Sequence, residues 1–223
     1  EDYECMGNFN KAKKEAESIL KIDKQNKWAI NFLLKMSEMI EDWDSATEKF
    51  IQLQRINNNQ DFNQLTKYLV YKGRDEIKNG DLHNAELLFN KAIKKTPEFG
   101  LPYKYLGDLK MINRDLINAI KLWEKFIELS PEKAHLVFDD MEAALFDLGR
   151  YSEVEKFYRR IIDVNKNDLE AGIKLANVLN EKGEENAAIE LIDKLINSGN
   201  DKISVLLMKL KLSLSIKTPI ELA

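Results

Sequence analysis

The sequence predicts an all-α protein built as a solenoid of stacked helical hairpins. Three observations lead to this fold class. Glycine and proline are scarce, with 9 and 4 residues among 223, while helix-favouring residues such as Lys, Glu, Leu, Ile and Ala are common. A small or β-branched residue recurs with a period of about 34 residues. An amphipathic stripe with helical spacing follows each of these residues.

The overall composition excludes several classes of protein. Hydrophobic residues make up 44% and charged residues 32%, a balance too apolar for a disordered chain. The net charge of −4 lacks the basic excess of a nucleic-acid-binding protein. No apolar run of about 18 residues occurs, so we expect no membrane span in these residues. The single cysteine, Cys5, excludes an internal disulfide and a thiolate metal cluster, and fits a reducing compartment.

The repeated feature is a turn residue followed, five positions later, by a small or β-branched residue. The pairs are Gly7/Ala12, Glu41/Ala46, Gly80/Ala85, Arg114/Ala119, Gly149/Val154, Gly183/Ala188 and, at the end of the sequence, Thr218/Ala223. From Ala12 to Ala188, successive second members lie 34, 39, 34, 35 and 34 residues apart. Two antiparallel helices approach closely only where the side chain at their crossing is small. Each pair therefore marks the turn and the crossing of one hairpin.

These marks divide residues 1–223 into one solenoid of repeats. We predict repeats at about 1–24 (partial), 27–60, 62–99, 100–133, 134–167 and 168–200, with a partial or capping unit at 201–223. Helices are expected at 9–22, 27–40, 43–56, 62–79, 82–95, 100–113, 116–129, 134–148, 151–164, 168–182, 185–197 and 201–215. The 39-residue step contains a polar segment, 57–61. This segment is either a longer surface turn or a flex point between two sub-domains.

Two segments, GDLHNAELLFNKAIKKTP (80–97) and RDLINAIKLWEKFIELSP (114–131), resemble the tetratricopeptide repeat almost position for position. The resemblance implies a right-handed superhelical solenoid. It also implies that the first helix of each hairpin lines a concave groove that holds segments of other proteins. One departure is Glu142, which stands where a small residue is usual and precedes Ala143. That unit either keeps its register or slips by one residue.

A narrower resemblance concerns residues 26–53, in which a Trp begins one helix and an acidic-Trp turn follows. This segment is similar to the repeat region of bacterial lipopolysaccharide assembly protein B and its relatives, and residues 119–162 have a similar character. The resemblance implies a cytoplasmic scaffold, tethered to the inner membrane, that regulates envelope biogenesis. The family's N-terminal membrane anchor and C-terminal knuckle of CxxC pairs do not lie in this sequence. The first residues lack an initiator Met, so we expect a fragment or a processed chain.

A search for catalytic and metal-binding motifs gives no candidate. The sequence has no GxGxxG, GxxxxGK[ST], HExxH or GxSxG motif. His83 and His135 lie 52 residues apart and are interpreted as surface or capping residues. We therefore predict no enzymatic activity, no catalytic residue, no metal site and no cofactor. The tryptophans Trp28, Trp43 and Trp123 are either packing residues or platforms for a ligand.

The candidate partner-binding residues follow from the family positions 2, 5, 9, 12 and 13, which face the groove. They are Lys35, Lys67, Val70, Arg74, Ile77, Lys78, Leu101, Lys104, Asp108, Met111, Asp139, Phe146, Asp147, Glu170, Asn177 and Glu181. The first half of this set is mainly basic and the second half acidic. One hypothesis is a bipolar groove that orients a partner by its charge; the alternative is that these charges only solvate the groove.

We therefore expect a protein-interaction scaffold whose partner is a protein or peptide segment. One alternative is a self-assembling scaffold of a secretion, pilus or organelle complex. Another is the docking arm of an enzyme whose catalytic domain lies elsewhere. The last predicted helix has an apolar face, Val205, Leu206, Met208, Leu210 and Leu212, that either caps the array or is open to another copy. Flanking residues would discriminate these alternatives, since a membrane anchor, CxxC pairs or a catalytic domain would each support a different one.

Overall fold

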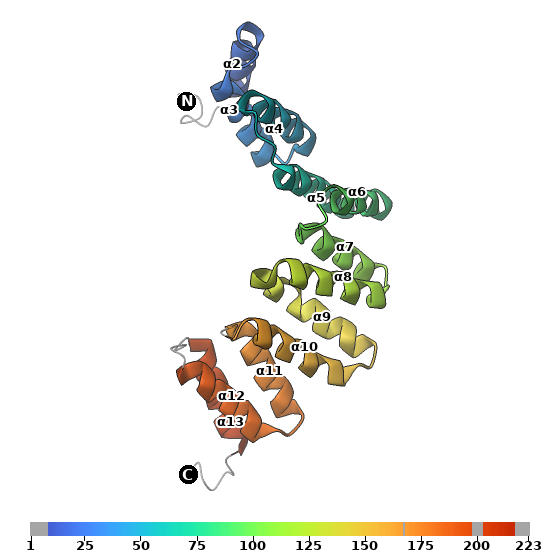
Figure 1. The fold of residues 1–223 in the computed structure, drawn as a ribbon, viewed down its shortest axis with the longest axis vertical. Coiled ribbons are helices and arrows are strands. Elements are labelled where there is room, and N and C mark those ends of the chain that lie inside the picture. Colours follow the sequence, from blue (N-terminus) through green and yellow to red (C-terminus); the bar gives the residue numbers. More distant parts are fainter. Residues whose placement is uncertain (1–8, 167, 198–202, 217–223) are drawn as a thin grey trace. The chain divides into compact units, whose positions relative to one another are not determined.

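The computed structural model describes residues 9–166, 168–197 and 203–216, and every regular element in these ranges is helical (Figure 1). Cys5 and the pairs that contain Gly7 and Thr218 lie wholly or partly outside the described residues. The chain divides into two compact units, Glu1–Leu109 and Lys110–Ala223, each of which is described by itself. The division falls within a helix, and the flex point at 57–61 stays a prediction.

The first unit is a series of antiparallel helical hairpins. Its helices are α2 (Phe9–Ile22), α3 (Lys27–Met39), α4 (Trp43–Asn57), α5 (Phe62–Lys78), α6 (Leu82–Lys95) and most of α7 (Leu101–Ile112). Helix α3 pairs with α4 and α5 with α6, while α2 packs on α3 and α4 on α5. From α2 to α6, each helix therefore packs on the next along the chain, as expected of a solenoid whose repeats bury one another's apolar faces.

The second unit continues the same sequence of elements. It contains α8 (Leu116–Leu129), a 3₁₀ helix η1 (Pro131–Val137), α9 (Phe138–Asp147), α10 (Tyr151–Val164), α11 (Leu169–Glu181), α12 (Glu185–Asn197) and α13 (Ile203–Ile216). Helix α10 packs on α9 and α11, and α13 packs on α12 and α11. The predicted all-α hairpin solenoid is confirmed, and the helix bounds agree within a few residues except at one place.

That exception is the segment 134–148, predicted as one α-helix. The structure has the 3₁₀ helix η1 followed by α9, and Val137 at the junction has a non-helical backbone with φ −128° and ψ 7°. The change of direction places the Phe138 ring edge-on to Phe157 and Tyr158, with ring centroids 5.8 and 5.4 Å apart. Packing of Phe138 into the core therefore accompanies the early end of η1.

The predicted turn residues adopt the left-handed conformation in all five hairpins that the structure describes. Their φ angles are 58° for Glu41, 83° for Gly80, 60° for Arg114, 70° for Gly149 and 79° for Gly183. The amide that follows each of them donates to a carbonyl five residues earlier, as from Asp81 to Glu76 at 2.8 Å. This bond satisfies a carbonyl at the end of the first helix and turns the chain into the second.

The small residues after these turns lie at buried crossings. Ala46, Ala85, Ala119, Val154 and Ala188 are each fully buried. On the opposite helix of the third hairpin, a Cβ added to Gly73 would lie 2.5 Å from Cε1 of the buried Phe89 ring. A glycine is therefore required where α5 meets α6, because the Phe89 ring occupies the place of a side chain.

Glu142 keeps the register of its hairpin. The hydroxyl of the fully buried Tyr158 on α10 donates a hydrogen bond to Glu142 Oε2 at 2.9 Å, so Glu142 faces the second helix. Ala143 is exposed. The alternative slip by one residue is therefore wrong. Tyr158 holds the same repeat position as Phe89, so here a hydrogen-bonded Tyr–Glu pair replaces the close aromatic–glycine contact.

Candidate functional site

The predicted partner-binding residues all lie on the first helices of hairpins, but they divide between the two units. Lys35 lies on α3; Lys67, Val70, Arg74, Ile77 and Lys78 on α5; Leu101, Lys104, Asp108 and Met111 on α7; Asp139, Phe146 and Asp147 on α9; and Glu170, Asn177 and Glu181 on α11. The surface is therefore described separately for each unit. The bipolar groove that would join them stays a prediction.

One predicted contact residue, Val70, cannot present its side chain to a partner. Val70 is fully buried. The family pattern assigns this position to the groove, but in this chain the apolar β-branched side chain packs into the hairpin instead. The other candidates in the first unit are partly or fully exposed. Val70 is thus a core residue that lies beneath the candidate surface.

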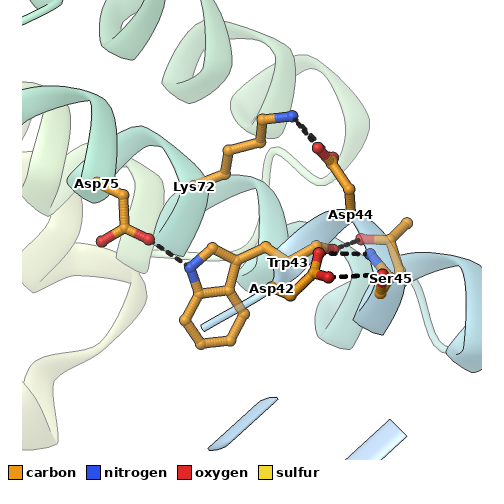
Figure 2. Close-up of polar contacts among 7 residues, drawn as sticks. Asp42, Trp43, Asp44, Ser45, Lys72 and Asp75 are labelled. Carbon is orange, nitrogen blue, oxygen red and sulfur yellow. Dashed lines mark hydrogen bonds and ion pairs between the residues drawn. The ribbon is translucent and has the colours of Figure 1, made fainter. Parts of the chain in front are cut away.

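Trp43 forms a polar corner between α4 and α5 (Figure 2). Its indole Nε1 donates a hydrogen bond to Asp75 Oδ2 at 2.6 Å, and its ring lies 4.9 Å from the Tyr71 ring, centroid to centroid. Asp75 Oδ1 accepts a second hydrogen bond from Lys78 Nζ at 2.8 Å. Burial raises the pKa of the Asp75 carboxyl, but the hydrogen bonds from Lys78 and Trp43 offset this, and the pKa is lowered overall. Trp43 is therefore a packing residue with a specific partner.

The start of α4 is fixed by its own side chains. Asp42 accepts hydrogen bonds from the Ser45 backbone amide at 3.0 Å and from Ser45 Oγ at 2.7 Å (Figure 2). The backbone hydrogen bond from Ser45 is the largest cause of the lowered pKa of Asp42. The adjacent Asp44 pairs with Lys72 of α5 at 2.7 Å. The Asp44–Lys72 ion pair joins the second hairpin to the third, beside the hydrogen bond from Trp43 to Asp75.

Several cations of the first unit already have acidic partners. Lys78 pairs with Asp75 and, at 3.4 Å, with Glu41. Lys104 pairs with Asp108 one helical turn away at 2.6 Å. These two predicted site lysines therefore carry compensated charges. Among the described residues, no ion pair is found for the other basic candidates, Lys35, Lys67 and Arg74.

Arg74 instead lies against aromatic rings. Its guanidinium carbon is 5.1 Å from the centroid of the Tyr105 ring on α7 and 6.0 Å from that of Tyr71 on α5. The Tyr105 ring is stacked on Phe89, with centroids 6.2 Å apart and an interplanar angle of 21°. Sequence reasoning placed Arg74 at the surface but missed both tyrosines. Their spacing could have been recognised, because Tyr71 and Tyr105 lie 34 residues apart, one repeat period.

Large apolar side chains are also exposed on α3. Trp28 is 45% exposed and stacks on Phe32 with ring centroids 5.6 Å apart, and Met39 is 64% exposed. Of the three tryptophans, Trp28 is exposed, Trp43 is half-buried and Trp123 is fully buried, so Trp28 is the most accessible to a partner.

In the second unit, two of the acidic candidates and Asn177 also have partners. Asp139 pairs with Lys174, whose Nζ also lies 3.3 Å from Glu142 Oε2. Asp147 pairs with Arg114 at 3.5 Å. Lys211 Nζ donates to Asn177 Oδ1 at 2.9 Å. The predicted acidic half is therefore less negative than its residue list indicates.

A pocket that sequence reasoning missed lies between α8 and α10, on second helices. Its volume is about 310 Å³, and its apolar lining includes Ile127, Pro131, Phe157, Ile161 and Val164. Arg160 and Glu124, 3.0 Å apart, pair beside it. The pocket could have been recognised in the sequence from the apolar residues of α10, because they occupy neither turn positions nor helix crossings.

The described residues contain no group of three or more His, Cys, Asp or Glu side chains placed to hold a metal ion. Among the described helices, none combines the length and apolar character that a membrane span needs.

Comparison with solved structures supports the tetratricopeptide-repeat fold. PilF of Pseudomonas aeruginosa aligns with 86% of this chain and 85% of its own, at 13% identity and a TM-score of 0.52. Yeast Tom70 aligns with 91% of this chain but only 43% of its own, at 15% identity and a TM-score of 0.56. Both are tetratricopeptide-repeat proteins. No family model matches the sequence. The chain thus has the fold of a tetratricopeptide-repeat solenoid.

Proposed function

We propose that this chain is a non-enzymatic scaffold that binds a segment of another protein on the first helices of its hairpins. The fold supports this function, because stacked hairpins expose an extended surface suited to a peptide segment. The observation that carries the proposal is that α3 has exposed apolar residues and that α3 and α5 have cations for which no ion pair is found among the described residues. Trp28 and Met39 supply the apolar surface, and Lys35, Lys67 and Arg74 supply the charge.

A narrower proposal concerns pathway and location. The resemblance of residues 26–53 and 119–162 to lipopolysaccharide assembly protein B supports a role in regulating envelope biogenesis at the cytoplasmic face of the inner membrane. The support is the sequence pattern alone: Trp28 begins one helix, and Trp43 lies in the acidic turn that follows.

The experiment for the scaffold function is selection of peptides from a displayed random library on the purified chain. Selected peptides should bind with measurable affinity in fluorescence anisotropy. The double variant Lys35→Glu and Lys67→Glu should abolish the binding of acidic peptides, because it reverses charge on the proposed surface. The matched control is Lys94→Glu, an exposed lysine on the second helix α6, which should leave binding unchanged. Absence of any peptide that binds the wild-type chain would contradict the proposal.

A second candidate function, self-assembly, is favoured by α13. Val205, Met208 and Leu212 of this helix are buried, while Leu206, Leu207 and Leu210 are 47%, 59% and 55% exposed. An apolar helix face of this kind is typical of an interface. Sedimentation velocity over a hundredfold concentration range tests it. Association that rises with concentration and is lost in the double variant Leu206→Lys and Leu210→Lys would support self-assembly, and a monomer throughout would exclude it.

A further inference from the structure

Arg74 lies near two tyrosine rings, one of which, Tyr105, also has Lys104 Nζ 4.9 Å from its centroid. The Arg74 guanidinium lies over Tyr105 and near Tyr71. Cation–π contacts stabilise such an arrangement. A guanidinium that contacts a ring through its flat surface keeps its in-plane N–H groups available. Arg74 thus contacts two rings while its side chain is exposed to solvent.

The two rings that flank Arg74 are themselves held. Tyr105 stacks on the fully buried Phe89, and Tyr71 packs on Trp43, which is fixed by its hydrogen bond to Asp75. A side chain that is ordered before binding loses less conformational entropy when a partner arrives. The position of Arg74 is therefore prepared by three hairpins.

The nearby carboxylates are occupied by other donors. Asp75 accepts hydrogen bonds from Trp43 and Lys78, and the charge of Arg74 helps to lower the pKa of Asp75, although the two side chains form no ion pair. Asp108 is bound by Lys104 at 2.6 Å. Within residues 9–109, no acidic side chain forms an ion pair with Arg74. An external carboxylate would find these N–H donors unused.

We propose that Arg74, flanked by Tyr71 and Tyr105, is the binding site for a carboxylate of the bound segment. Arginine is suited to this role, because its fork of N–H groups can bind both oxygens of a carboxylate. The inference rests on the proposed function and names the chemistry of the partner, which is an acidic segment. The carboxylate is supplied either by an Asp or Glu side chain or by the end of a chain.

Lys67 supplies a second cation on the same face of α5. It lies seven residues before Arg74, which corresponds to two helical turns and about 10 Å along the axis. In an extended segment of polyproline II type, residues i and i+3 share one face and lie about 9 Å apart. The preferred segment therefore has two acidic residues separated by two others, with one carboxylate at Arg74 and the other at Lys67.

The test uses peptides selected from a random twelve-residue library on the wild-type chain. Selected peptides should be enriched in acidic residues with the i, i+3 spacing. Arg74→Gln should weaken their binding about tenfold, corresponding to about 1.4 kcal/mol. Arg74→Lys should weaken it less, because the charge remains and the fork is lost. Lys94→Gln on α6 is the matched control and should have no effect.

Coupling between the two sides identifies the contact. Replacing the critical Glu of the peptide by Gln should weaken binding to the wild-type chain and have little further effect on Arg74→Gln. C-terminal amidation distinguishes the sources. Binding kept after amidation assigns the carboxylate to a side chain, and binding lost assigns it to the chain end. Two results would contradict carboxylate binding at Arg74 while leaving the scaffold function intact. One is a set of selected peptides without acidic enrichment, and the other is additive effects of the peptide Glu→Gln and Arg74→Gln replacements in this double-mutant cycle. Failure to select any peptide would overturn the scaffold function itself.

Discussion

The indole Nε1 of Trp43 and the Asp75 carboxylate, 32 residues apart in the sequence, are joined by a hydrogen bond of 2.6 Å. Trp43 is the first residue of α4, and Asp75 lies near the end of α5, so the bond spans two hairpins. Lys78 binds the other carboxylate oxygen at 2.8 Å. The contact fixes α4 on α5, and through Tyr71 it also sets the ring beside Arg74.

The replacement Asp75→Asn tests this corner. We expect it to lower the free energy of unfolding by about 1–2 kcal/mol at pH 7, because two hydrogen bonds to a charged group are weakened. The pKa of Asp75 is lowered in the folded state, so its stabilisation is present above the unfolded pKa near 3.8 and is lost as the pH falls below it. Urea unfolding at pH 7 and at about pH 3 should show a smaller difference between variant and wild type at the lower pH.

The matched control is Asp44→Asn, which removes an exposed ion pair to Lys72 on the same helices. Exposed ion pairs contribute little, so we expect almost no change. An equal loss in Asp44→Asn and Asp75→Asn at pH 7, or a loss in Asp75→Asn that does not depend on pH, would contradict the role given to this corner.

Two glycines at helix crossings should respond differently to alanine. A Cβ at Gly73 would lie 2.5 Å from the ring of Phe89, which is fully buried and cannot move aside. A Cβ at Gly172 would lie 2.6 Å from the terminal Cδ1 of Leu195, which another rotamer can relieve. We expect Gly73→Ala to destabilise the fold by about 2–3 kcal/mol and Gly172→Ala by clearly less, as measured by urea unfolding. The double variant Gly73→Ala with Phe89→Leu should recover part of the loss.

The repeat period predicted the positions of turns even where the residue type argued against them. Glu41 and Arg114 both have positive φ although neither is glycine, and each was identified only by the buried alanine five positions later. The repeat period predicts these turns because hairpin packing determines the backbone conformation of the turn residue. The residue type determines only how strained that conformation is. Hairpin packing also explains why the repeat keeps its register although Glu142 stands where a small residue is usual. The Tyr158 hydroxyl donates a hydrogen bond to the Glu142 carboxylate, which a small residue would not need.

The candidate site was less predictable, because side-chain pairing decides it. The pairs Asp75–Lys78 and Lys104–Asp108 follow helical spacing and could have been predicted from the sequence. The absence of an ion pair for Arg74 among the described residues could not be predicted in this way, because it depends on the hydrogen bond from Trp43 to Asp75, two residues that are 32 positions apart. Val70 was assigned to the surface by the average family pattern.

Replacing Arg114 by glycine should stabilise the fold. Its φ of 60° places a side chain in the left-handed region, at a penalty of about 1–2 kcal/mol relative to glycine. Its ion pair with Asp147, at 3.5 Å, is exposed and offsets little of this. We expect Arg114→Gly to raise the free energy of unfolding by about 1 kcal/mol. Gly149→Ala, at φ 70° in the next hairpin with open space around it, should lower it by a similar amount. A decrease in Arg114→Gly would show that the arginine makes a contact that outweighs the strain.

Alkaline pH should destabilise the second unit through Tyr158. Burial raises the pKa of this phenol, and the charge and hydrogen bond of Glu142 raise it further. The folded state therefore holds the proton more tightly than the unfolded chain, so the stabilisation is complete below the unfolded pKa near 10 and is lost as the pH rises above it. We expect the urea midpoint of the wild type to fall steeply between about pH 10 and pH 12.

Tyr158→Phe separates this effect from other alkaline changes. At pH 8 it should lower the free energy of unfolding by about 1 kcal/mol, because Glu142 loses a hydrogen bond while Lys174 remains beside it. From about pH 10 to pH 12 it should lose less stability than the wild type, because no buried phenol remains at position 158 to ionise. The control Tyr151→Phe replaces an exposed tyrosine and should follow the wild-type curve. A Tyr158→Phe curve parallel to that of the wild type would show that another group controls the alkaline transition.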